Sequence, residues 1–177
     1  MSDVEWDEWL GLHNLVFEFE ISPKLVDDLV RVCLQPEHWA LRNAGRRRIL
    51  IQEGGCFRLE WLPSQWRLIF RVHLDKGRWA SFEIFTGARS KGRVQVKIGC
   101  SSNPIRISAE LGLKDLIEVL IKAGEAFDWL LRYKNLTEYQ VLKFTDWTLK
   151  SCEINRDGKY SISKHFPSPL PVEIFMR

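Results

Sequence analysis

Arginine and lysine residues are concentrated in the middle of the chain, and their type and spacing point most directly to a chemical role. Residues 42–106 contain fourteen basic and four acidic residues, a net charge of +10. Residues 1–41 carry a net charge of −7, and residues 107–177 are balanced. Clustered cations bind nucleic acids because they displace counterions condensed along the phosphate backbone. The distribution of charge therefore favours nucleic-acid binding by the middle of the chain.

Alternation along the predicted strands places many of these cations on one face of a sheet. Successive side chains of a strand point to opposite faces, so cations that alternate with apolar residues face away from the core. The triplet 46–48 and the loop 87–92 are expected at the rims of this basic face. The candidate nucleic-acid-binding residues are Arg46, Arg47, Arg48, Arg58, Arg67, Arg71, Arg89, Lys91, Arg93 and Lys97.

Four of these residues, Arg67, Arg71, Arg93 and Lys97, carry a specific expectation. They should be exposed, should form one positive patch, and should tolerate substitution with a change in stability within about 0.5 kcal/mol. If they instead prove to be buried, or pair with the acidic residues of segment 1–41, the cations are structural, and a role in protein interaction is favoured over nucleic-acid binding.

Residues suited to catalysis or metal binding do not cluster in the sequence. The common phosphate-binding and nucleophile motifs are absent, and no two histidines have the spacing of metal ligands. The sequence therefore predicts a protein that is not an enzyme and needs no cofactor. The four isolated histidines are His13, His38, His73 and His165.

Two alternative functions compete with nucleic-acid binding. The acidic N-terminal segment 1–13 carries Trp6 and Trp9, and with the proline-bearing tail 166–177 it could dock on a protein partner, since tryptophan is enriched at interface hot spots. The order of elements also permits a small-molecule carrier. That function requires an apolar cavity of about 300 Å³ or more between the long helix and the sheet.

The elements that must position these residues indicate a single α+β domain spanning residues 1–177. Apolar periodicity predicts an antiparallel β-meander covered by one long and one shorter helix, followed by a C-terminal β-hairpin. A short amphipathic helix is expected at residues 4–12, and the tail from Phe166 is expected to be extended on the surface. The predicted strands are 15–21, 46–52, 56–62, 66–74, 78–86, 93–99, 138–145, 147–154 and 159–164, and the predicted helices are 23–33 and 113–131.

Composition places the chain among cytoplasmic globular proteins. Hydrophobic residues make up 45% and charged residues 28% of the chain, values typical of a domain with its own core. No apolar run approaches the length of a membrane helix, and the N-terminus is acidic where a signal peptide would be cationic. The four cysteines lack metal-binding spacing, which predicts reduced thiols and no metal site.

Overall fold

The structure is a computed structural model that describes residues 12–43, 45, 47–74, 78–100, 112–139, 141, 143–156 and 160–172. The helix expected at residues 4–12 lies outside this part of the chain except for Leu12, which begins the first strand.

Eight antiparallel strands form one sheet in the order β2-β3-β4-β5-β6-β1-β7-β8. The predicted meander is formed by β2 to β6, and β1 adds to its far side before the C-terminal hairpin β7-β8. The α+β class, the meander and the hairpin are thus confirmed. The strands are β1 (Leu12–Glu20), β2 (Ile49–Glu53), β3 (Phe57–Leu62), β4 (Arg67–His73), β5 (Arg78–Phe85), β6 (Arg93–Cys100), β7 (Thr148–Arg156) and β8 (Tyr160–Pro171).

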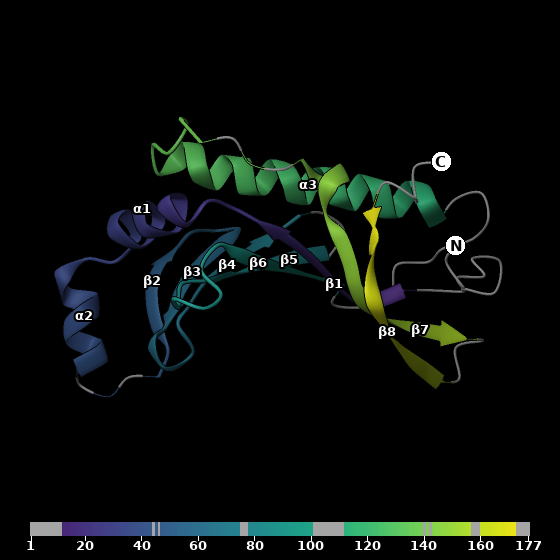
Figure 1. Cartoon of the computed structure of the whole chain (residues 1–177), viewed down its shortest axis with the longest axis horizontal. Coiled ribbons are helices and arrows are strands. Elements are labelled where there is room, and N and C mark those ends of the chain that lie inside the picture. Colours follow the sequence, from purple (N-terminus) through teal and green to yellow (C-terminus); the bar gives the residue numbers. More distant parts are fainter. Residues whose placement is uncertain are drawn as a thin grey trace.

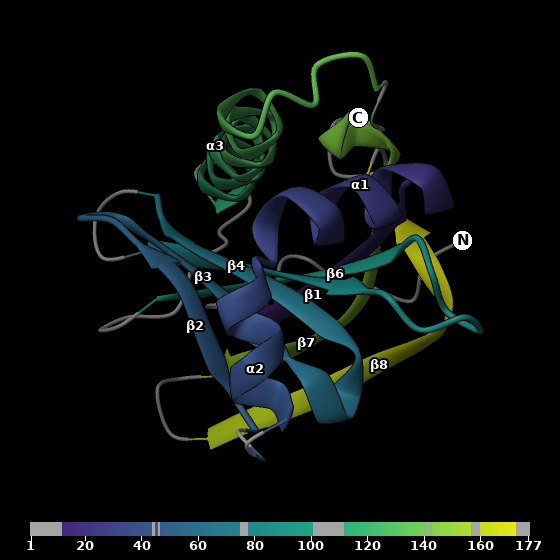
Figure 2. The same ribbon diagram turned by 90° about the vertical axis from the view of Figure 1, so that its left-hand side faces the viewer.

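The helices α1 (Pro23–Cys33) and α3 (Gly112–Tyr133) lie over one face of the sheet (Figures 1 and 2). The Ser22 hydroxyl accepts a hydrogen bond from the Leu25 amide at 3.0 Å, which caps α1 as its Ser-Pro start predicts. None of the helices in the described residues is long and apolar enough to cross a membrane.

Two features of the fold differ from the sequence prediction. A further helix, α2 (Pro36–Asn43), lies in a stretch where the sequence analysis predicts no helix, and His38 Nδ1 accepts from the Gln35 amide at 2.9 Å. The strand predicted at residues 138–145 is wrong. Phe144 instead begins a short 3₁₀ turn and packs beside Gly124 of α3. This segment therefore contacts α3 and pairs with no strand among the described residues.

Aromatic side chains fill the space between α3 and the sheet. Phe127 of α3 lies 5.1 Å from Phe82 of β5, and Trp129 lies 6.2 Å from Phe70 of β4, both measured between ring centroids. Phe82 and Phe70 stack on each other at 5.9 Å. These contacts hold α3 across the strands, and the opposite face of the sheet carries charged residues together with a few apolar ones such as Ile69 and Phe85.

The last strand, β8, forms one edge of the sheet and contains Pro167, Pro169 and Pro171. The Val172 amide donates to the Trp147 carbonyl at 2.8 Å, so the nitrogen of the preceding Pro171 points away from β7. The tail expected to be extended is therefore part of the edge strand β8, which pairs with β7 up to His165 and again at Leu170 and Pro171, with a register shift between the two.

Candidate nucleic-acid interface

The predicted cations of the strands lie on the face of the sheet opposite α3, here called the outer face. Arg71, for example, lies between Phe70 and Val72, which are buried in the core. Arg58, Arg67, Arg93 and Lys97 occupy equivalent alternating positions on β3, β4 and β6.

A row of three glutamates crosses the outer face between these cations. Glu60 on β3 is separated from Glu83 on β5 by Ile69, and Glu83 is separated from Glu18 on β1 by Gln95. All five residues occupy successive register positions on neighbouring strands. These three carboxylates are called the glutamate row, and cations lie on both sides of the row.

Each carboxylate of the glutamate row pairs with two cations, one at each oxygen. These six cations are called the cation layer. The nitrogen-to-oxygen distances are 3.1 Å for Arg48 and 2.9 Å for Arg58 at Glu60, 3.1 Å for Arg67 and 3.3 Å for Lys97 at Glu83, and 3.6 Å for Lys150 at Glu18, whose other oxygen pairs with Arg93.

The cation layer lies outside the glutamate row. The side chains of Glu60, Glu83 and Glu18 are 7%, 11% and 19% exposed, whereas those of the cation layer are 29% to 59% exposed. Six cations surround three carboxylates, so the cluster keeps a surplus of three positive charges. Burial, and secondarily the charge of Arg93, lower the pKa of the Lys150 ammonium.

This pairing corrects the expectation for the four test residues. Arg67, Arg93 and Lys97 are partly buried and ion-paired, and Arg93 engages Glu18 of segment 1–41. Only Arg71 meets the expectation, being exposed and, among the described residues, paired with no carboxylate. Substitution of Lys97 should consequently cost stability, because it leaves one oxygen of a nearly buried carboxylate without a partner.

Two aromatic side chains of β5 support the arginines from below. The guanidinium carbons of Arg67 and Arg93 lie 4.4 and 5.0 Å from the ring centroid of Phe85, and that of Arg71 lies 5.4 Å from the Trp79 ring. Such cation–π contacts fix the planes of the guanidinium groups. The arginines are thus held in place before any ligand arrives.

The predicted rim residues have different surroundings. Arg47 and Arg89 are exposed and, among the described residues, make no ion pair, whereas Lys91 pairs with Asp27 of α1 at 2.7 Å. Arg89, Lys91 and Arg93 line a hollow of about 340 Å³ beside Glu20 at the end of β1. Arg46, Trp6 and Trp9 lie outside the described residues.

Sequence reasoning missed Glu18, Glu83 and Lys150 as members of this surface. Alternation does place Glu18 and Glu83 on the outer face, since each stands between two core residues. The missing information was the order of the strands, which sets β1 between β6 and β7. Without that order, the partners of Arg93 could not be identified.

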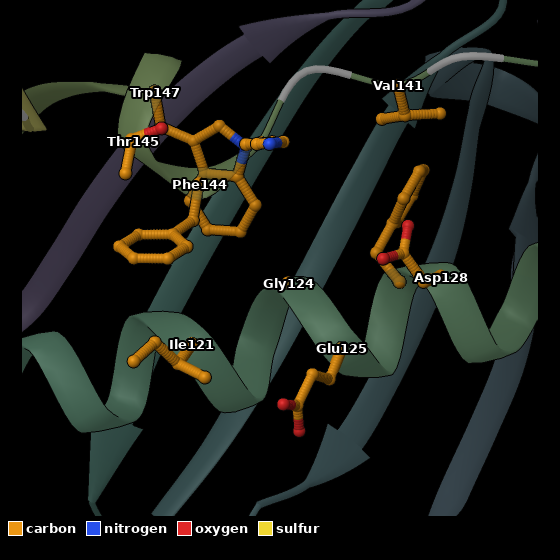
Figure 3. A pocket seen from close by; sticks show the side chains of 10 residues that line it. Ile121, Gly124, Glu125, Asp128, Val141, Phe144, Thr145 and Trp147 are labelled. Carbon is orange, nitrogen blue, oxygen red and sulfur yellow. The ribbon is translucent and has the colours of Figure 1, made fainter.

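The carrier alternative requires a cavity between α3 and the meander, where the described part of the chain has aromatic rings in contact. A hollow of about 230 Å³ lies elsewhere, between α3 and the segment that follows it. Phe144, Thr145 and Trp147 form one side of this hollow, Val141 and Asp128 lie on the other, and Gly124 lies between them (Figure 3). We therefore do not propose a carrier function.

The described residues contain no cluster of three or more histidine, cysteine, aspartate or glutamate side chains that could hold a metal ion. No protein-family model, no curated protein and no solved structure matches the chain.

Proposed function

We propose that the outer face binds the phosphate backbone of a nucleic acid and catalyses no reaction on it. The observation that carries this proposal is the ratio of six cations to three carboxylates in the cluster. The cations form its exposed layer, so the surplus charge is presented outward.

The ion pairs reduce the net charge of this surface, but they also hold its cationic side chains in place before a phosphate binds. Glutamates beneath the cation layer and aromatic rings beneath Arg67, Arg71 and Arg93 restrict the side chains. A ligand then loses less of its binding free energy to ordering flexible arginines. Contacts of this kind recognise the backbone and do not read bases, so binding should depend little on sequence.

Three surplus charges and Arg71 give about four phosphate contacts. On duplex DNA, each contact contributes about −0.9 to the slope of log affinity against log salt concentration. The expected slope is therefore about −3.6. This salt dependence is much less steep than that of a protein that uses every cation in residues 42–106.

Fluorescence anisotropy with labelled single-stranded RNA and duplex DNA at several salt concentrations tests the proposal. Arg71→Gln should reduce the duplex slope by about 0.9, because it removes a cation that no described carboxylate neutralises. Arg132 is an exposed residue of α3, so Arg132→Gln is the matched control and should leave the slope unchanged. Absence of binding at low salt, or equal slopes for the two variants, would refute the proposal.

A protein-interaction function is the second candidate. It is favoured by the ion pairs of Arg93 with Glu18 and of Lys91 with Asp27, which use positive charge within the fold. It stays second because Arg93 is the one test residue that pairs with segment 1–41 in the described part of the chain, and the side chains of Arg67, Arg93 and Lys97 remain 29%, 33% and 45% exposed. Its expected anchors, Trp6 and Trp9, lie outside the described residues. A folded protein that binds neither RNA nor DNA in the titration would give this candidate first place.

A further inference from the structure

A third hollow, of about 230 Å³, lies on the outer face beside the β2-β3 hairpin. It is lined by Arg58 of β3, by Arg71 and His73 of β4 and by further residues of the hairpin. The hairpin residues that line it are Glu53, Gly54, Gly55 and Phe57.

Arg58 and Arg71 both line this hollow and occupy paired register positions of β3 and β4, and Glu53 is the register partner of Arg58 on β2. Like charges directly opposite each other on a sheet are destabilising. Glu60 holds Arg58 from behind at 2.9 Å, and the Trp79 ring supports Arg71. Glu53 also lines the hollow, but it is exposed and makes no ion pair within the described part of the chain.

We propose that this hollow binds one phosphate monoester between Arg58 and Arg71. Two guanidinium groups can each donate a pair of hydrogen bonds to phosphate oxygens, and a monoester carries nearly two negative charges at neutral pH. An anion there removes the repulsion between the two arginines. Gly55 lines the hollow, and there is open space beside it, since a Cβ at this position would meet no atom within 4 Å.

The inference deepens the proposed function, because a nucleic acid with a terminal phosphate supplies such a group. An internal phosphodiester carries only one negative charge, so the hollow should discriminate between a chain end and the rest of the backbone. The phosphate of a free nucleotide offers the same chemistry and is distinguished by the experiments below.

The first experiment compares one labelled RNA sequence with a 5′-phosphate and with a 5′-hydroxyl. The phosphorylated RNA should bind at least about fivefold more tightly, because a single charge about 4 Å from a cation in water gives that factor and the monoester carries nearly two charges. Arg71→Gln should abolish this difference, and Arg132→Gln should preserve it. If both RNAs bind equally well, the inference is overturned while the backbone-binding function stands.

The second experiment adds inorganic phosphate alone and follows backbone amide resonances by NMR. The amides of Gly55 and Arg71 should shift, and Gly55→Asp should weaken the shift because it adds a negative charge to the lining of the hollow. Gly45→Asp adds the same charge at another exposed glycine and should not interfere. Shifts without any RNA binding would refute the backbone function but support the site, whereas no shift would overturn the inference.

Discussion

Glu83→Gln separates a structural role of the cation layer from a binding role. The carboxylate is 11% exposed and accepts from Arg67 at 3.1 Å and from Lys97 at 3.3 Å. Glutamine keeps the shape and removes the charge. A hydrogen bond to a charged group contributes about 1.5–3 kcal/mol, but exposed ion pairs contribute at most about 1 kcal/mol.

The two cations at Glu83 are 29% and 45% exposed, so their contribution falls between these limits. We expect Glu83→Gln to lower the free energy of unfolding by about 2 kcal/mol, which corresponds to a decrease in Tm of about 4–8 °C for a chain of this size. The same variant raises the surplus on the outer face from three charges to four. RNA affinity at low salt should therefore rise about fivefold.

Thermal unfolding and the anisotropy titration would be performed on the same preparations. Glu125→Gln, an exposed glutamate of α3, removes one negative charge on the other side of the sheet and should change stability by less than about 0.5 kcal/mol. A Tm equal to that of the control would contradict the stabilising role of the pairs. A lower Tm with unchanged RNA affinity would show that the cations serve the fold alone.

Three further predictions concern other parts of the fold. Gly92→Ala should lower the free energy of unfolding in urea by about 3 kcal/mol, because φ is +102° and the new Cβ would lie 2.5 Å from a backbone oxygen, whereas Gly45→Ala, at φ +79° in open space, should cost only about 1 kcal/mol. The Tyr139 hydroxyl donates to Asp28, which lowers the pKa of that carboxyl and raises the pKa of Tyr139 to about 12. The stability difference between the wild type and Tyr139→Phe should thus be constant from about pH 5 to 9 and should shrink below about pH 4 and from about pH 10 to 12, as followed by urea unfolding. Burial raises the pKa of the Cys33 thiol to about 11, so iodoacetamide at pH 8 should modify it only after unfolding, as peptide mass spectrometry would reveal.

Local patterns in the sequence were sufficient to predict most elements of the fold. Leu68, Phe70 and Val72 alternate along β4 and are all buried, and Ser22 followed by Pro23 marks the start of α1. Both signals act over a few residues. They depend on side-chain direction and backbone preference, which hold wherever the element packs.

The candidate site could be predicted only in part, because it depends on contacts between distant residues. The alternation of side chains along β6 predicts that Arg93 lies on the outer face, but its partner Glu18 is 75 residues away in the chain. The pairing exists because β1 crosses to the far side of the meander and lies beside β6. The net charge of +10 on residues 42–106 already counts Glu60 and Glu83, but it omits Glu18 and Asp27 of the N-terminal segment, which pair with Arg93 and Lys91.

The prolines of β8 have a consequence for how the protein behaves when crowded. A proline nitrogen carries no hydrogen and cannot donate to an added strand, so this edge is a poor template for another chain. The other edge, β2, has only five residues and a register shift between Leu50 and Gln52, which also disfavours strand addition. Copies of the protein brought close together along one polyanion should therefore remain separate molecules and should not fuse their sheets into fibrils.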